Sequence, residues 1–419
     1  MHTKINKPYI FHIDFDSYFV SAIRTVRTDL KNTPLAIGKP NYKSIATSVS
    51  YDLRSKGAKA GMNRFEILKI EPKTVFVEAN FELFTQISTN IFDYLEMHYA
   101  SIINVASIDE CYIELRQNIL DDHHAIQIAR KIQKEILAKF DIPITIGISY
   151  KPFFAKMTTN ISKPFGVGLT NEINYKEHFF NLPISDFHGI GKASSSKLKK
   201  LGIFKIQDLV EKPINDYVFQ SVFGIVYKTW LKNIDPSIYE HLMPQNNIPK
   251  GIGNEITFDR ENLSEINLYD SLIEISKKVS FRAKRQGMVG NVITLCVRFD
   301  NKKWVLKNHK IDHYTNEYQK IFQIAKYLFD KYYLESNIIG LGIRLSNLIF
   351  YFNNQESIEL FSSHSSENAS NMAINRIISQ VNRQMKKPLL RTLKNIQERQ
   401  NIKARVNKYA LEGFVFKKR

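Results

Sequence analysis

The first 150 residues contain predicted apolar strands and amphipathic helices in an order that few folds accommodate. Residues 9–13 are mostly apolar, as is typical of a buried strand, and Ser17 can begin a helix that continues toward Val26. Residues 102–115 contain two apolar runs that predict a hairpin. Residues 122–140 place apolar side chains on one helical face, and 143–149 return to a strand. This order of strand, helix, strand, strand, helix, strand predicts a ferredoxin-like sheet.

The length of the chain predicts several domains, since 419 residues exceed what one hydrophobic core usually supports. A Lys- and Ser-rich segment over 18–80, with turns at Gly57 and Gly61, predicts a small inserted subdomain. The pattern over 170–240 is helical. Residues 241–249 are rich in Pro and Asn, which predicts a linker.

Beyond the linker, residues 250–355 predict an α+β module. Helices are expected over 271–285 and 314–333, and strands over 292–299 and 339–350. Residues 356–419 begin with a Ser-rich stretch and continue as a basic tail. The fold class expected for the whole chain is therefore α+β.

Composition narrows the kinds of partner. The formal net charge of +18 indicates a polyanionic partner, either nucleic acid or an anionic membrane surface, although an AT-rich coding bias also enriches Lys. No run approaches the roughly 18 apolar residues of a membrane span, and the N-terminus lacks a signal-peptide pattern. Cys111 and Cys296 are too few for a disulfide framework or a cysteine zinc site. We expect a cytoplasmic protein without a membrane partner.

Acidic side chains lie at the ends of two predicted strands. Asp14 follows the first strand, and Asp109 and Glu110 lie near the tip of the hairpin. Phosphoryl transfer by two metal ions needs carboxylate oxygens that converge from such positions. Ordinary turn and cap acids produce the same short patterns. Asp16 is expected to cap the following helix by accepting a hydrogen bond from its N–H groups, outside the metal set.

Five runs of sequence together resemble one known family. The similarity extends to about residue 355, and it is to the Y-family translesion DNA polymerases of the bacterial polymerase IV and V kind. It implies a right-hand fold with a palm (1–17 and 81–169), fingers (18–80), a helical thumb with a helix-hairpin-helix (170–240), a linker (241–249) and an α+β little finger (250–355). The runs are FHIDFDSYFVSA, SIATSVSYDLRSKGAKAGM, VASIDECYIEL, GISYKPFFAKMTTNISKPFGVGL and DFHGIGKASSSKLKKLGI.

The resemblance also implies roles for single residues. Asp14, Asp109 and Glu110 match the family's carboxylate ligands for two Mg²⁺ ions, with the Phe15 carbonyl as a further ligand. Phe19 matches the steric gate, an aromatic ring that would collide with a 2′-hydroxyl, although a lone Phe is more often part of a core. The nucleotide-binding positions are Phe15, Tyr18, Phe19, Ser48, Tyr51, Arg54 and Lys156, which offer backbone amides, hydroxyls, a guanidinium and an ammonium.

Two further regions imply contacts with primed template DNA. The turn at 188–191 resembles a helix-hairpin-helix, in which glycines let backbone amides approach a phosphate. The lysines that follow it add charge, as a solvated helix face also would. The runs SFRAKRQGMVGNVITLCVRF and GLGIRLSNL are similar to the little finger. The candidate DNA contacts are Gly189, Gly191, Lys192, Arg282, Lys284, Arg285, Arg298 and Arg344.

The segment after residue 355 resembles the short peptide by which bacterial polymerases of this kind dock on the sliding clamp. Its candidate contacts are Ile358, Leu360 and Phe361. The spacing is imperfect, because Ser357 stands where the peptides usually have glutamine, and these apolar side chains could instead seal the little finger. The chain also has Lys151-Pro152 where the family usually has Asn-Lys.

The sequence thus predicts a monomeric, template-directed, low-fidelity DNA polymerase that adds dNTPs to a primer 3′-hydroxyl in translesion synthesis and damage tolerance. Small fingers that enclose the nascent pair loosely would tolerate damaged templates. One alternative is a non-catalytic, DNA-binding accessory relative, which retention of the three carboxylates argues against. A second is a nucleotidyl cyclase with a similar sheet, which would leave the helix-hairpin-helix and the basic C-terminal module without a purpose.

Overall fold

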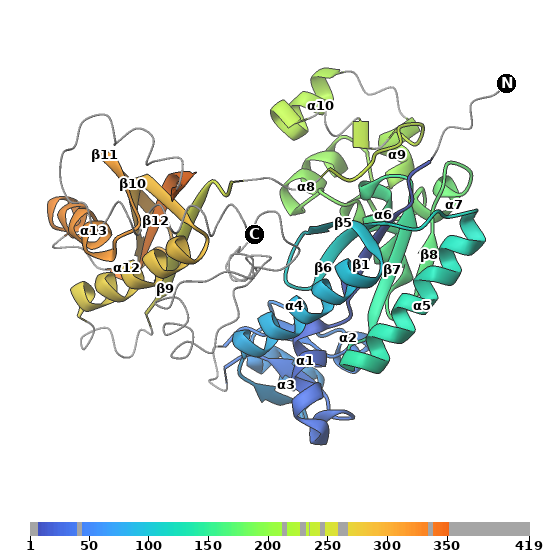
Figure 1. Ribbon diagram of the computed structural model, residues 1–419, viewed down its shortest axis with the longest axis horizontal. Helices are drawn as coiled ribbons and strands as arrows, with labels where there is room; N and C mark the ends of the chain where they lie inside the picture. Colours follow the sequence, from blue (N-terminus) through green and yellow to red (C-terminus); the bar gives the residue numbers. More distant parts are fainter. Residues whose placement is uncertain are drawn as a thin grey trace, which may run out of the picture. The chain divides into compact units, whose positions relative to one another are not determined.

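A computed structural model describes residues 7–39, 44–211, 216–226, 232–233, 235–243, 248–258, 267–333 and 338–351. The chain divides into two compact units, residues 1–245 and 246–419. Each unit is built around its own larger sheet (Figure 1). The division falls within the linker expected at 241–249. In the part of the chain described, no helix is long and apolar enough to cross a membrane.

The main sheet of the first unit has five strands in the order β5-β6-β1-β7-β8. Strands β5, β6, β1 and β7 pair with one another in antiparallel fashion, and β8 pairs with β7 in parallel. This is the predicted ferredoxin-like arrangement extended by one strand. The strands are β1 (Ile10–Phe15), β5 (Ala100–Val105), β6 (Glu110–Leu115), β7 (Ile144–Ser149) and β8 (Val167–Leu169).

The side chains of β1 alternate between two covered faces of this sheet. On one face the Phe15 ring lies 5.4 Å from Phe92 of helix α4. On the other face the His12 ring lies 2.8 Å from the Thr159 hydroxyl of helix α6. Burial on both faces explains why most side chains of β1 are apolar. The helices packed against the sheet are α4 (Phe81–His98), α5 (Asp122–Phe140) and α6 (Pro152–Ser162), as Figure 1 shows.

The segment between β1 and α4 forms a small subdomain. Its three-stranded sheet, in the order β3-β2-β4, packs on a core of small aliphatic side chains such as Ala36, Val49 and Leu53. A capping box between Asn63 and Glu66 fixes the start of α3. Its elements are α1 (Tyr18–Val26), η1 (Thr28–Leu30), β2 (Leu35–Ile37), β3 (Ser48–Val49), α2 (Tyr51–Ser55), α3 (Arg64–Ile70) and β4 (Val75–Val77).

Short helices follow the sheet, as the helical pattern over 170–240 predicts. They share a core with Phe153, Phe154 and Met157 of α6. Their bounds are α7 (Tyr175–Phe179), η2 (Ile184–Asp186), α8 (Lys192–Lys200), α9 (Ile206–Glu211), α10 (Asp216–Phe223) and η3 (Gly224–Val226).

The first residues of the expected linker are fixed on the main sheet. Leu242 is buried, and its backbone N–H donates to the Glu114 carboxylate of β6 at 3.1 Å. The Met243 carbonyl accepts a hydrogen bond from the Asn104 amide of β5 at 3.0 Å. Leu242 and Met243 therefore belong to the first unit.

The second unit is an antiparallel sheet in the order β11-β10-β12-β9. Helices α12 and α13 share a core with its odd-numbered β10 side chains, Ile293, Leu295 and Val297. Beyond the register shift between Gly290 and Val292, the even-numbered side chains of β10 therefore lie on the sheet face away from these helices. The elements are β9 (Gly251–Thr257), α12 (Leu268–Arg285), β10 (Met288–Phe299), β11 (Trp304–Thr315), α13 (Tyr318–Tyr332) and β12 (Ile338–Phe350).

Two expectations for this unit were incomplete. Strands β9 and β11 were not predicted, and the helix expected over 314–333 begins only at Tyr318, because residues 314–315 end β11. Strand β11 is an edge strand with mostly exposed side chains, and it carries Lys307, His309 and Lys310. A strand of this kind lacks the apolar alternation on which the prediction depends.

Candidate active site

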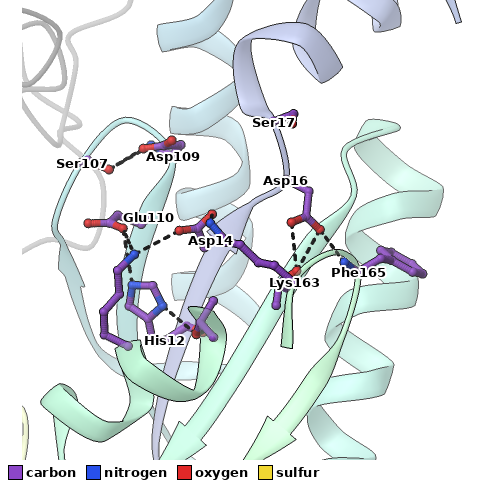
Figure 2. A network of polar contacts seen from close by, with 12 residues as sticks. His12, Asp14, Asp16, Ser17, Ser107, Asp109, Glu110, Lys163 and Phe165 are labelled. Carbon is purple, nitrogen blue, oxygen red and sulfur yellow. Dashed lines mark hydrogen bonds and ion pairs between the residues drawn. The ribbon is translucent and has the colours of Figure 1, made fainter. Parts of the chain in front are cut away.

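Strand pairing brings the acidic runs together. Asp14 on β1 lies directly opposite Glu110 on β6, and the Phe15 N–H donates to the Asp109 carbonyl at 2.8 Å. The three carboxylates proposed from the sequence therefore lie at one end of two neighbouring strands (Figure 2).

Two lysines approach these carboxylates from α6 and from the residue that follows it. The Lys156 ammonium lies 3.1 Å from Asp14 Oδ2 and donates to Glu110 Oε2 as well. The Lys163 ammonium lies 2.5 Å from Asp14 Oδ1. Asp14 and Glu110 thus share one cationic partner, which lies between them.

Asp109 points elsewhere. Its carboxylate accepts a hydrogen bond from the Ser107 hydroxyl at 2.5 Å (Figure 2). As the side chains stand, no three His, Cys, Asp or Glu residues of the described segments are arranged to hold a metal ion together. The structure therefore brings two of the three proposed ligands to one point and turns the third away.

The chemistry of these donors nevertheless fits a hard divalent cation. All three side chains offer carboxylate oxygens, the ligands that Mg²⁺ and Mn²⁺ prefer. Asp14 and Glu110 already face a common positive charge, the Lys156 ammonium. Asp109 would join them only by turning away from Ser107.

The electrostatics of the site follow from this arrangement. Burial, followed by the charge of Asp14, raises the pKa of Asp109 to about 6. Burial acts in the same direction on Glu110, but His12 and Lys156 outweigh it and hold the pKa of Glu110 well below its usual range. The charges of Asp14 and Glu110 outweigh the burial of Lys156 and raise its pKa to about 12.

Asp109 should therefore destabilise the metal-free fold when it is ionised. An acid whose folded-state pKa lies near 6 rather than near 4 costs stability above pH 6 and costs none below pH 4, where both states are protonated. Asp109→Asn keeps the acceptor for Ser107 and removes the charge. We expect it to unfold at a higher temperature than the wild type at pH 7.5, with the difference shrinking toward pH 4. Equal melting temperatures across this range would contradict the stated cause.

Asp16 does not cap α1, contrary to the expectation. The residue at the N-cap position is Ser17, and it has no side-chain cap hydrogen bond. The Asp16 carboxylate instead accepts hydrogen bonds from the Thr145 hydroxyl, the Phe165 N–H and the Tyr51 hydroxyl, each at 2.9 Å. Asp16 thus ties β7, the turn after α6 and helix α2 to the end of β1.

Phe19 is half-buried and belongs to an aromatic cluster with α4. Its ring stacks on Phe84 at 4.6 Å between centroids, with 19° between the planes, and Phe81 packs edge-on against it at 6.0 Å. Tyr18, the residue before it, is buried, and its hydroxyl donates to the Phe84 carbonyl. Tyr18 is thus fixed by α4, while Phe19 stays partly exposed.

The other proposed nucleotide contacts lie on the small subdomain. Ser48 is buried on β3. Tyr51 donates to Asp16, and the Arg54 guanidinium lies 5.1 Å from the centre of the Tyr51 ring. Arg54 also donates to the Val49 carbonyl at 3.2 Å. Tyr51 is thereby connected through Asp16 to β1, the strand that carries Asp14.

Comparison with known proteins decides the family. Residues 13–160 match the impB/mucB/samB family and residues 249–360 match the C-terminal domain of the same family. DNA polymerase IV of Ureaplasma parvum is 28% identical over 362 residues, which cover 86% of this chain and 99% of the relative. DNA polymerase IV 1 of Halalkalibacterium halodurans is 27% identical over 391 residues, which cover 91% of this chain and 92% of the relative. The chain belongs to the Y family of translesion DNA polymerases.

Solved structures agree with the Y-family fold. A Y-family DNA polymerase chimera of Dbh and Dpo4 superposes with a TM-score of 0.69 at 23% identity, covering 82% of this chain and 99% of the chimera. An insertion ternary complex of Dbh DNA polymerase gives a TM-score of 0.61 at 23% identity, with coverages of 82% and 99%. The predicted α+β polymerase fold is therefore confirmed.

Lys163 was not identified from the sequence as a residue of the active site. It contacts the same carboxylate as Lys156. The two lysines are seven residues apart, which is about two turns of helix. This spacing alone could have indicated that both lie on the same side of the helix. The run NISKPFG that contains Lys163 was already part of the resemblance.

The residues proposed for the helix-hairpin-helix lie at the start of α8. Gly189 has φ +91°, a backbone conformation that favours glycine, and Gly191 is the N-cap of α8. Lys192 and Lys199 are among the residues that line an open hollow beside this turn. Backbone amides and lysine side chains are thus available on one surface of the small helices.

The basic residues proposed for the little finger lie on two different elements. Arg298 lies on β10. Arg344 lies on β12, opposite Thr294 of β10, and it shares with Arg298 the sheet face away from the helices. Arg282, Lys284 and Arg285 instead lie in the last turn of α12. Arg282 donates to the Gly253 carbonyl of edge strand β9 at 2.6 Å, and this hydrogen bond connects α12 to the sheet. Only the first two residues therefore share a face of the sheet.

The proposed clamp-binding residues Ile358, Leu360 and Phe361 lie outside the described residues. The basic tail to Arg419 does so as well. Their roles stay predictions from the sequence.

Proposed function

We propose that this Y-family chain is a template-directed DNA polymerase that joins a dNTP to a primer 3′-hydroxyl and tolerates damaged templates. The observation that carries the proposal is the pairing of Asp14 with Glu110, which directs two carboxylates at one cation position. A non-catalytic accessory relative would have no need for that pairing.

Two Mg²⁺ ions are the proposed cofactors, held by the carboxylates of Asp14, Asp109 and Glu110 and by the Phe15 carbonyl. Bound ions of this kind activate the attacking hydroxyl and neutralise charge on the triphosphate. The part played by the chain is to present oxygen donors from adjacent strands at one end of the sheet. Asp109 completes the set when it leaves Ser107.

The triphosphate is the proposed partner of the basic side chains around the site. Lys156 and Lys163 now neutralise Asp14 and Glu110. When cations take over those carboxylates, both ammonium groups become available for phosphate oxygens. Arg54 and the Tyr51 and Ser48 hydroxyls approach from the small subdomain. In α1 the first backbone hydrogen bonds are donated by Val20 and Ser21, which leaves the Tyr18 and Phe19 amides to bind phosphate.

Primer extension on undamaged and damaged templates tests this function. The purified chain, a primed template and the four dNTPs should give extension with Mg²⁺ and none with a chelator. An abasic site in the template should slow extension past the lesion rather than stop it. A chain that binds the primed template but never extends it with Mg²⁺ would favour the non-catalytic relative.

The proposed DNA contacts on the second unit predict a change in salt dependence. In an Arg298→Ala, Arg344→Ala double variant, two phosphate contacts should be lost, and the slope of log affinity against log salt should fall by about 2. Fluorescence anisotropy with primed DNA at several salt concentrations measures it. Lys277→Ala, which removes an exposed charge from α12, is the matched control and should leave the slope unchanged. Equal slopes in all three proteins would remove these arginines from the DNA contacts.

A sliding clamp is a further proposed partner. Leu360 and Phe361, near the Gln355 that precedes them, would bury two apolar side chains in a groove of the clamp. A Leu360→Ala, Phe361→Ala variant should insert single nucleotides at the wild-type rate and lose the increase in product length that the clamp gives. Equal stimulation of both proteins by the clamp would contradict this docking site.

A further inference from the structure

His12 is a buried polar residue of the active site to which neither the sequence resemblance nor the proposed function assigns a role. Its side chain is fully buried between β1 and α6. Nδ1 lies 2.8 Å from the Thr159 hydroxyl, and the ring packs edge-on against Tyr112 at 4.6 Å. Nε2 lies 3.6 Å from Glu110 Oε2, slightly too far for a hydrogen bond, and has no other hydrogen-bond partner among the described residues (Figure 2).

Gly147 explains why Thr159 can reach this ring. Gly147 on β7 lies opposite His12, and a Cβ at this position would lie 2.3 Å from the Ala155 carbonyl and from the Thr159 N–H nitrogen. Only glycine therefore lets α6 approach the sheet closely enough for Thr159 to touch His12. The contact is a consequence of the packing of α6 on β1 and β7.

The hydrogen bonds around Thr159 favour one tautomer of His12. The Thr159 hydroxyl has one hydrogen and three neighbours, His12 Nδ1 at 2.8 Å and the carbonyls of His12 and Ala155 at 3.1 Å each. The Ala155 carbonyl already accepts the helical N–H of Thr159, and His12 lies in a central strand whose backbone groups are paired. The nearest neighbour without another donor is Nδ1. A hydroxyl that donates to Nδ1 leaves the hydrogen of the neutral ring on Nε2.

The opposite tautomer would place two acceptors face to face. Nδ1–H would donate to Thr159, and the Nε2 lone pair would then point at the Glu110 carboxylate in a buried site. With the hydrogen on Nε2, the same geometry places a donor beside that carboxylate. Full burial keeps the ring neutral.

We propose that His12 is a positioning residue for Glu110: Thr159 holds the ring as the Nε2–H tautomer, and Nε2–H becomes the donor to Glu110 Oε2 when Lys156 leaves that oxygen. The proposal rests on the proposed function, because Lys156 leaves Glu110 when cations and a triphosphate enter the site. Glu110 would otherwise lose its fixed direction at the moment when it becomes a ligand.

The tautomer can be read from the metal-free wild-type chain, independently of any polymerase activity. Two-bond proton–nitrogen NMR spectra of the full chain labelled in histidine, with His12 assigned by its loss in His12→Gln, should show a neutral ring with the hydrogen on Nε2 at pH 7.5. A spectrum with the hydrogen on Nδ1, or of a doubly protonated ring, would overturn the proposal.

Binding of Mn²⁺ alone, measured by electron paramagnetic resonance, tests the effect on Glu110. His12→Leu removes the donor and should weaken Mn²⁺ binding by about 10-fold, whereas His12→Gln places an amide N–H near the position of Nε2 and should recover most of the affinity. Thr159→Val and Thr159→Ser form a second matched pair, of which only Thr159→Val should weaken binding. Equal affinities within both pairs would contradict a positioning role. A wild-type chain that binds no Mn²⁺ would instead contradict the proposed function, and the tautomer would still be decided by the NMR spectrum.

Discussion

Asp109→Asn combined with Glu110→Gln should reduce the rate of nucleotide insertion by at least about 10⁴-fold while primed-DNA affinity stays within about 2-fold. The two amides keep the size and the acceptor oxygens of the acids but remove two of the three negative charges that would hold the cations. DNA affinity depends mainly on phosphate contacts elsewhere, so it should change little. Single-turnover insertion and fluorescence anisotropy measure the two quantities.

The matched control for this variant is Asp312→Asn combined with Glu317→Gln. Both acids are exposed and lie on the second unit. Because this control also replaces two acids by amides, it changes the net charge by the same amount. It should insert nucleotides at the wild-type rate. An Asp109, Glu110 double variant that turned over normally would contradict the assignment of these two residues as metal ligands.

Phe19→Ala should increase the incorporation of ribonucleotides relative to deoxynucleotides by about 100-fold, the range typical of a single steric contact. The ring stacks on Phe84 and the residue is only half-buried, as a residue that limits the space beside a sugar needs to be. Removing the ring opens that space. The ratio of insertion efficiencies for rNTP and dNTP opposite one template base is the quantity to measure.

Phe81→Ala separates a sugar gate from a packing role. Phe81 contacts both Phe19 and Phe84 edge-on, so that its removal loosens the same aromatic cluster without removing the gate. This variant should keep wild-type sugar selectivity. If Phe19→Ala also kept it, Phe19 would be a packing residue only.

The main sheet could be predicted because burial leaves a clear pattern in the sequence. Strand β1 is covered on both faces and is therefore mostly apolar, with His12 and Asp14 as its polar residues, and α5 carries a regular apolar face that gave its bounds, Asp122–Phe140, directly. Edge strand β11 could not be predicted in this way, because exposure on an edge removes the constraint on its side chains.

The candidate site was predictable in its composition but not in its contacts. The acids were found because they follow apolar strands, and strand register then determines that Asp14 faces Glu110. Which cation lies between them depends on the packing of α6, and the direction of Asp109 depends on a local hydrogen bond from Ser107. Asp16 was assigned to the helix nearest in sequence, although two of its three partners, Thr145 and Phe165, are more than 120 residues away.

Dependence of insertion on the template base tests the central claim most directly. The purified chain with Mg²⁺ is given one dNTP at a time on four primed templates that differ only in the first unpaired base, with the Asp109→Asn, Glu110→Gln variant in parallel to detect contaminating polymerases. Each template should direct insertion of its complementary nucleotide most efficiently, with pyrophosphate released in equal amount and the variant inactive. Insertion that ignores the template base, or equal activity in the variant, would contradict templated synthesis by this site.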